Sequence, residues 1–225
     1  MAVPGPVAPK GAAETVTRSA ALNLPSRPAS ARGLKIGDSW TYRLRDVRFS
    51  KNLATVTHEI GGGDASGIRE TVRSGERAAT QRRLPLEARI FEQPLNQNAT
   101  LFEFAPFMAE FAELQPGVTW NKIAGATSSD SVNEWRFSGK VTGRERVGVP
   151  AGNFDAIKAE LEGELSISSP MSRNVASETI PARQTYSIWF VPEIGRAVKY
   201  VRRTFNRAQL LLDHEQYELV SYELK

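Results

Sequence analysis

The two histidines are the first residues to consider for chemistry, because an imidazole can act as a general base or bind a metal. They are His58 and His214. His58 shares the parity of Val56 and Ile60 in an alternating segment, which favours a packed core histidine over a ligand or a base. His214 shares one strand face with Gln216 and Glu218, an ordinary spacing for an exposed strand. We therefore expect no metal site and no cofactor.

Other catalytic signatures are missing from the sequence. The chain has no cysteine, which excludes disulfides, thiolate catalysis and Cys-based zinc sites. It contains no Gly-x-Ser-x-Gly nucleophile elbow. The glycine run 61–63 lacks the Lys-Ser/Thr ending of a phosphate loop, and a hairpin turn over 61–64 explains it better. The sequence thus predicts no catalytic residues and a protein that is not an enzyme; a hydrolase with an unrecognised site is the remaining alternative.

Two groups of charged residues could take part in recognition. A row of carboxylates alternates with apolar residues, and because catalytic carboxylates need a desolvated pocket, we interpret the row as a charged surface. The densest basic cluster of the folded part is a candidate site for an anionic partner, such as lipid headgroups or an acidic protein. A solvated edge strand is the alternative for that cluster. The carboxylates are Glu160, Glu162 and Glu164, and the cluster is Lys199, Arg202, Arg203 and Arg207.

The charge distribution argues against a nucleic-acid partner. The chain carries a net charge of +4, of which residues 1–33 hold +3, from four basic residues and one acidic residue. Residues 34–225 therefore carry only +1. A nucleic-acid-binding domain concentrates positive charge on its folded face. We expect no nucleic acid among the partners.

The composition divides the chain into a linker and one domain. Residues 1–33 are rich in Ala, Pro and Ser and have no aromatic residue, which predicts a flexible linker. Residues 34–225 form the predicted antiparallel β-domain. No apolar run approaches the roughly 20 residues of a transmembrane segment. The N-terminus as given lacks the pattern of a signal peptide, so we expect a mature chain to which Met1 was added.

Period-two alternation predicts strands through most of residues 34–225. Trp40, Tyr42 and Leu44 alternate with polar residues, and segments 67–74, 77–84 and 86–93 are more polar strands near a sheet edge. Residues 132–168 predict a hairpin closed at 150–154. That closure would place Arg144 opposite Glu160, and Lys140 opposite Glu164.

Two further patterns complete the predicted fold. Phe107, Phe111 and Leu114 recur at helical spacing between two prolines and predict one short helix. The spacing Leu-x-x-Gly-x-x-Trp occurs at 34–40 and again at 114–120, where a glycine turn would deliver a tryptophan into a strand. We predict a mainly β protein with a single curved antiparallel sheet forming an open or half barrel; a β-sandwich is the alternative.

The order of four short motifs resembles a family of bacterial exported proteins. The motifs are Gly-Asp-x-Trp-x-Tyr at 37–42, Leu-x-Pro-Gly-x-x-Trp at 114–120, Val-x-Val-Pro-Ala-Gly-x-Phe-Asp-Ala at 147–156 and Trp-Phe-Val-Pro-x-Ile-Gly at 189–195. In this order they resemble DUF3108-like proteins of unknown function, over most of residues 34–225. The resemblance implies a periplasmic or cell-envelope location and a curved sheet similar to that of lipoprotein carriers. It implies no catalytic residues, and the chain lacks the N-terminal Cys of lipid-anchored relatives.

These expectations favour a non-catalytic envelope protein. It would bind a hydrophobic ligand, such as a lipid or a lipoprotein, or a protein partner on the curved sheet. The alternative is a structural accessory subunit of an envelope assembly, with no small-molecule ligand. Ligand, partner and oligomeric state are left open by the sequence. The candidate ligand-binding residues are Trp40, Tyr42, Trp120, Trp135 and Phe137.

Overall fold

The alternation of apolar and polar residues produces strands throughout the part of the chain that the structure describes. This computed structural model describes residues 34–64, 67–84, 116–117, 119–128, 131–167 and 181–225. The elements in these ranges are strands joined by turns. The predicted linker 1–33, the predicted strand 86–93 and the predicted helix over 107–114 lie outside the described residues.

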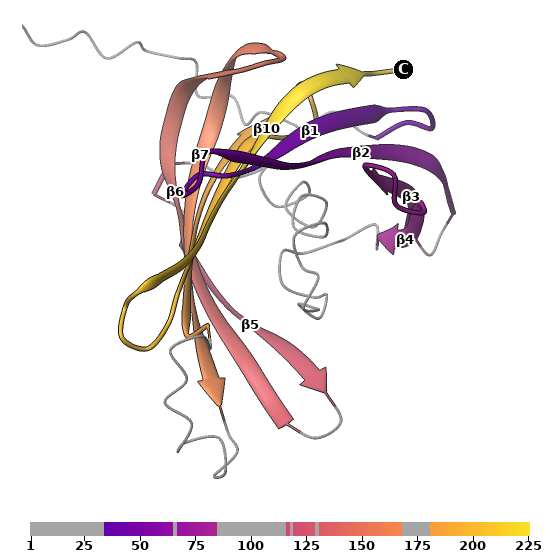
Figure 1. The fold of residues 1–225 in the computed structure, drawn as a ribbon. Helices are drawn as coiled ribbons and strands as arrows, with labels where there is room; N and C mark the ends of the chain where they lie inside the picture. The colour runs from indigo at the N-terminus through magenta and orange to yellow at the C-terminus, as the bar shows by residue number, and fades with distance from the viewer. Residues whose placement is uncertain (1–33, 65–66, 85–115, 118, 129–130, 168–180) are drawn as a thin grey trace, which may run out of the picture.

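Ten strands form one antiparallel sheet in the order β4-β3-β2-β1-β10-β9-β8-β7-β6-β5 (Figure 1). Two meanders, β1 to β4 and β5 to β10, are joined because β1 pairs with β10. Within the described ranges no pairing joins β4 to β5, so the sheet is not closed. The predicted single, open antiparallel sheet is confirmed. The strands are β1 (Ser39–Asp46), β2 (Lys51–Asp64), β3 (Gly67–Ser74), β4 (Thr80–Leu84), β5 (Thr119–Ser128), β6 (Ser131–Val149), β7 (Gly152–Ile167), β8 (Arg183–Val191), β9 (Arg196–Phe205) and β10 (Leu211–Glu223).

The inner face of the curved sheet carries the apolar core. Tyr200 lies at its centre, with ring centroids 5.6 Å from those of Tyr186 and Tyr217. Aromatic side chains bury large areas, and pairs at this separation add a further stabilising contact. One cross-strand row of buried residues runs through Val141, Ala159, Ile188, Tyr200, Tyr217 and Leu44.

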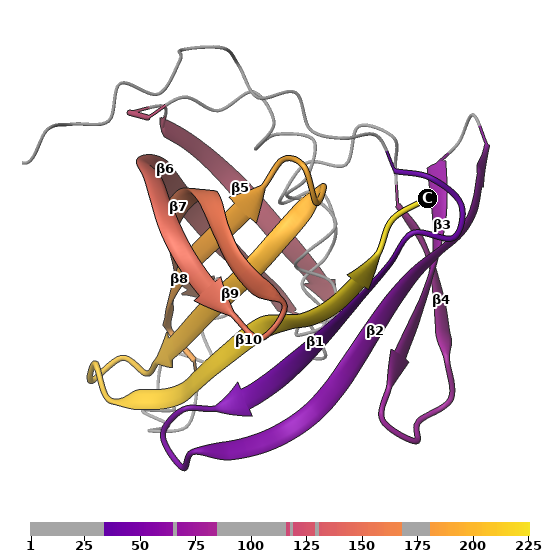
Figure 2. The same ribbon diagram turned by 90° about the horizontal axis from the view of Figure 1, so that it is seen from above.

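Contacts across the concavity fix the curvature of the sheet. The indole Nε1 of Trp40 donates to the carbonyl oxygen of Ile194 at 3.2 Å. The hydroxyl of Tyr42 donates to the carbonyl oxygen of Ala197 at 2.9 Å. The first bond joins β1 to the β8–β9 turn, and the second joins β1 to the start of β9. Strands β1 and β9 are not neighbours in the sheet, because β10 lies between them. Seen from above, β1 to β4 curve away from β6 to β9 (Figure 2). The two meanders are therefore held together by side chains as well as by the β1–β10 ladder.

A charge pair without exposed surface lies among these contacts. The guanidinium of Arg196 in β9 donates to the carboxylate of Glu70 in β3, and both side chains are 0% exposed. The Arg196 guanidinium also lies 4.2 Å from the Trp40 ring centroid, a cation–π contact. His58 Nδ1 is 3.4 Å from Glu70 Oε1, and its ring meets Tyr42 edge-to-face. The prediction that His58 is a packed core histidine is thus confirmed.

Burial also changes the chemistry of Tyr42. Desolvation raises the pKa of its hydroxyl well above the ordinary value, and the nearby Arg196 only partly opposes this effect. The phenol therefore stays protonated and can donate to Ala197. This bond satisfies a polar group that would otherwise be costly to bury.

The predicted register of the β6–β7 hairpin is wrong by three residues near the turn and by four residues beyond Gly143. Lys140 lies opposite Glu160 rather than Glu164, and Arg144 lies opposite Ile157 rather than Glu160. The turn is tighter than expected, because Val149 already pairs with Gly152. An irregularity between Val141 and Gly143 then shifts the pairing by one more residue.

Two predictions concern glycines: the repeated Gly turn before a Trp is confirmed, and the turn at 61–64 is not. In the repeated Leu-x-x-Gly-x-x-Trp motif, Gly37 and Gly117 have φ values of +88° and +90°, which favour glycine, and each precedes a strand. The predicted turn at 61–64 is wrong, since β2 continues through Asp64. A Cβ on Gly62 would come within 2.8 Å of Arg69 Nη2, so this glycine lets the arginine cross the strand.

We predict that Glu70→Gln lowers the free energy of unfolding by about 3–5 kcal/mol, because it leaves the buried Arg196 charge without its partner. Urea denaturation measures the loss. The matched control is Glu59→Gln, because Glu59 pairs with Arg73 at 2.6 Å on an exposed surface. That control should cost less than about 1 kcal/mol.

A second variant separates loss of the charge pair from general damage to the core. Glu70→Leu/Arg196→Met removes both charges and should recover much of the stability that Glu70→Gln loses. A double variant no more stable than Glu70→Gln would contradict this account of the pair.

Candidate functional site

The aromatic residues predicted to bind a ligand are divided between two parts of the sheet. Trp40 and Tyr42 are fully buried, and each donates to a backbone carbonyl, so they hold the core. Trp120 lies in β5, and Trp135 and Phe137 lie in β6, with their side chains outside the described part of the structure. The structure describes only two of these five side chains, and a binding role for the five stays a prediction.

The predicted basic cluster is also divided. Arg202 lies on the inner face, where it pairs with Glu215 at 2.6 Å. Lys199 lies on the outer face, 3.8 Å from Glu218, and exposed Arg203 is on the same face. Arg207 is exposed in the following turn. The edge-strand interpretation is wrong, because β9 lies between β8 and β10.

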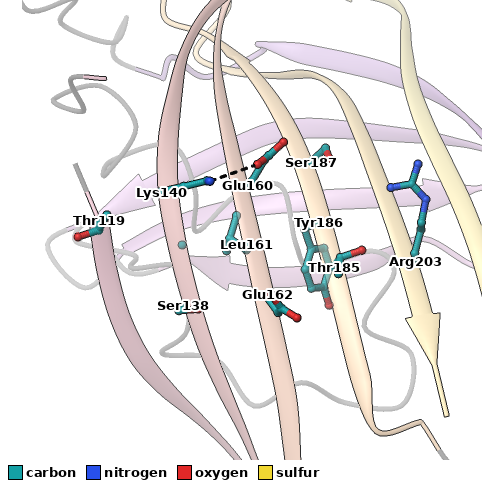
Figure 3. Close-up of a pocket in the computed structure, with 11 residues that line it drawn as sticks. Thr119, Ser138, Lys140, Glu160, Leu161, Glu162, Thr185, Tyr186, Ser187 and Arg203 are labelled. Atoms are coloured by element: carbon teal, nitrogen blue, oxygen red, sulfur yellow. Dashed lines mark ion pairs between the residues drawn. The ribbon is translucent and has the colours of Figure 1, made fainter. Parts of the chain in front are cut away.

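A groove of about 590 Å³ opens on the outer face of β5 to β9 (Figure 3). Polar side chains that lie on the outer face of their strands line the groove in two cross-strand rows. The first row is Thr119, Lys140, Glu160 and Ser187. The second row is Ser138, Glu162, Thr185 and Arg203.

Ion pairs occupy the carboxylates of the groove. Glu160 lies 4.0 Å from Lys140 and 3.9 Å from Lys158, and Glu162 accepts a hydrogen bond from Arg183. Two members of the glutamate row, Glu160 and Glu162, therefore form a charged surface that is already paired. Arg203, in contrast, is exposed and has no ion pair with any residue that the structure describes.

Arg203 sets the electrostatics at its end of the groove. His214 lies directly opposite it in β10. Burial lowers the pKa of His214 below its ordinary 6.5; Arg203 lowers it further, and Asp46 acts in the opposite direction. The imidazole is therefore largely neutral at pH 7, and the positive charge of Arg203 favours an anion at this position.

On the inner face a carboxylate, rather than a histidine, has a shifted pKa. Burial raises the pKa of Glu215, and the neighbouring Arg202 opposes the shift only in part.

Within the described residues no group of three or more His, Asp or Glu side chains could hold a metal ion. The described part also contains no helix that is long and apolar enough to span a membrane. Whether the protein is an enzyme stays a prediction.

Sequence reasoning missed the groove, although its signal was present. The outward parity of four successive strands is polar, as in Ser138, Glu162, Thr185 and Arg203. Strand order and register decide which of these residues are neighbours, and the predicted register was wrong. With the observed pairing, the two rows follow directly.

Comparison with known proteins finds similarity only among solved structures. No family model and no curated protein sequence matches the chain. A proposed lipoprotein from Parabacteroides distasonis is 11% identical, with a TM-score of 0.47 over 88% of this chain and 100% of that one. A proposed exported protein with a YmcC-like fold from Bacteroides fragilis is 14% identical, with a TM-score of 0.44 over 87% and 99%. The hypothetical lipoprotein YmcC from Escherichia coli is 9% identical, with a TM-score of 0.43 over 82% and 84%. These similar structures are named as exported proteins or lipoproteins, and membership of the DUF3108-like family stays a prediction.

Proposed function

We propose that this chain is a non-catalytic protein of the bacterial envelope that binds a protein partner in the groove on the outer face. The observation that carries the proposal is the groove itself, an open volume of about 590 Å³ with hydroxyl and charged side chains along its walls. The envelope location is supported by the motif order that resembles DUF3108-like exported proteins.

The lining of the groove favours an extended protein segment over a lipid chain. Ser138, Thr185 and Ser187 can donate to and accept from a peptide backbone. A hydrocarbon chain in the same place would desolvate Lys140 and Glu160 without giving them new partners, which is unfavourable. Bound lipid is therefore the outcome that this proposal does not expect.

The charge of the groove favours an acidic residue in that segment. The carboxylates of the groove have cationic partners, whereas Arg203 has no ion pair within the described part of the chain. A carboxylate at Arg203 could form a bidentate, charge-assisted hydrogen bond. Thr185, its cross-strand neighbour, would lie beside the same bound group.

We predict that Thr185→Tyr weakens partner binding at least tenfold, about 1.4 kcal/mol, because the bulkier, neutral side chain fills the groove between Arg203 and Glu162. Native mass spectrometry after mild extraction from bacterial envelopes measures the complex. The matched control is Thr55→Tyr, since Thr55 is exposed on β2, away from the groove.

A partner that stays bound to Thr185→Tyr as tightly as to Thr55→Tyr would contradict the groove as the binding site. Co-purified lipid without a protein would favour the hydrophobic-ligand function instead. A stable protein partner that is retained by both variants would favour the structural accessory subunit.

We also predict that His214 reports on the occupancy of Arg203. In the free protein its pKa should be below 6.5, and Arg203→Gln should raise it by removing a repulsive charge. A six-residue glutamate peptide should raise it in the wild type, because a nearby carboxylate stabilises the imidazolium. NMR titration measures the pKa of His214. Its signal can be told from that of the other histidine, His58, because His58 is buried.

A six-residue lysine peptide is the control for this titration and should leave the His214 pKa unchanged. Because the folded-state pKa is lowered, the unfolded chain binds more protons between that value and 6.5, so stability should rise with pH in this window. A His214 pKa that responds neither to Arg203→Gln nor to the glutamate peptide would rule out the anionic site.

A further inference from the structure

Two turns form one end of the sheet, away from the buried charge pair. The β1–β2 turn, residues 47–50, and the β9–β10 turn, residues 206–210, lie at the same end of the molecule (Figure 2). The backbone N–H of Val47 donates to the backbone carbonyl oxygen of His214 at 2.8 Å, and the guanidinium of Arg48 donates to the carbonyl oxygen of Leu212. We refer to residues 45–53 and 206–213 together as the paired turns.

The paired turns expose large apolar side chains. Phe49, Leu53 and Leu210 are 68%, 45% and 56% exposed, half of the six exposed large hydrophobic residues in the described part. The guanidinium carbon of Arg48 lies 5.0 Å from the Phe49 ring centroid, so a cation accompanies the aromatic ring. Exposed apolar side chains that gather at one place mark interaction sites more often than scattered ones do.

The same residues concentrate positive charge. The paired turns contain four basic side chains, Arg45, Arg48, Lys51 and Arg207, and two acidic ones, which gives a net charge of +2. Residues 34–225 as a whole carry only +1, so the remainder of the domain is net negative. One of the two acids, Asp46, accepts hydrogen bonds from the backbone N–H groups of Arg48 and Phe49.

Local hydrogen bonds hold the apolar side chains outward. Asn206 is buried, and its side-chain oxygen accepts from the Leu210 backbone N–H at 2.9 Å. Ser50 and Gln209, with φ values of 52° and 60°, are the two non-glycine residues in the described ranges with positive φ. Such conformations are costly and persist where the surrounding structure imposes them. The exposed Phe49 and Leu210 are thus presented by defined turns.

We propose that the paired turns dock the protein onto a membrane surface that contains anionic phospholipid. Phe49 and Leu210 enter the interfacial region, while Arg48, Lys51 and Arg207 meet the phosphate headgroups. Apolar burial combined with basic residues is the chemistry that binds proteins reversibly to such surfaces. The projecting turns suit a bilayer better than a protein surface, which would have to provide a matching hollow for each. This docking surface does not depend on the function proposed for the groove.

Vesicle flotation with the full chain tests this proposal. Vesicles of phosphatidylcholine with about one third phosphatidylglycerol should bind the protein at least tenfold more tightly than phosphatidylcholine alone, and added salt should weaken the binding. Phe49→Ser/Leu210→Ser should reduce binding at least tenfold. The control is Ile36→Ser, because Ile36 is 69% exposed but precedes β1, at the opposite end of that strand.

Charge variants and an inserted probe give independent readouts. Arg48→Gln/Arg207→Gln should remove the preference for phosphatidylglycerol, whereas Arg77→Gln/Arg146→Gln, at exposed positions elsewhere, should keep it. Because the chain has no cysteine, Leu210→Cys can carry a single polarity-sensitive dye, whose emission should shift to the blue on vesicles. The same dye at Ile36→Cys should not shift.

Equal binding to both vesicle types, or full binding by Phe49→Ser/Leu210→Ser, would overturn the proposal. Circular dichroism and thermal unfolding of each variant exclude misfolding as the cause of lost binding. Thr185→Tyr, which adds no charge, should bind vesicles like the wild type, so failure of the groove and failure of the docking surface are distinguishable.

Discussion

The buried pair of Arg196 and Glu70 is the interaction on which the shape of this protein depends most. An open sheet has no ladder that closes on itself, so strand pairing alone does not fix how far it curls. Here β9 reaches across the concavity to β3, and the charge pair is flanked by the Trp40 ring and by His58. A buried ion pair gives little net stability, but an unpaired charge in the same place is very costly. The pair therefore penalises every curvature that separates its members.

The outer face follows from the same constraint. With the curvature set, the strands from β5 to β9 bring two polar rows into one groove. Most charges on this face pair across neighbouring strands, as Lys140 does with Glu160 and Lys199 with Glu218. Such pairs specify register more than they add stability. Among the charged residues that line the groove, Arg203 is the one without an ion pair in the described part, and for that reason the recognition argument rests on it.

The sequence predicted which side chains face the interior better than it predicted which strands pair and in which register. Parity alone assigned Tyr42, Leu44 and His58 to the interior, and all three are buried. Register failed at Lys140, because neither the tight turn at Val149 nor the irregularity near Gly143 leaves a distinctive sequence signal. The pairing of β1 with β10 joins the first and last strands, and sequence separation hides it. Without that pairing β9 resembled an edge strand.

Strand β9 and the turn that follows it connect all of these features, because their basic residues fall on different faces and at different ends. Arg196 lies in the core, Arg202 in an inner ion pair, Arg203 in the groove and Arg207 in the paired turns. Arg203 and Asn206 are three residues apart, which at about 3.3 Å per residue is roughly 10 Å. This separation is close to the Debye length of about 8 Å at physiological ionic strength. An anionic membrane at the turns would therefore act on the groove only weakly, by opposing an acidic partner at Arg203, and the opposition would grow as the salt concentration falls.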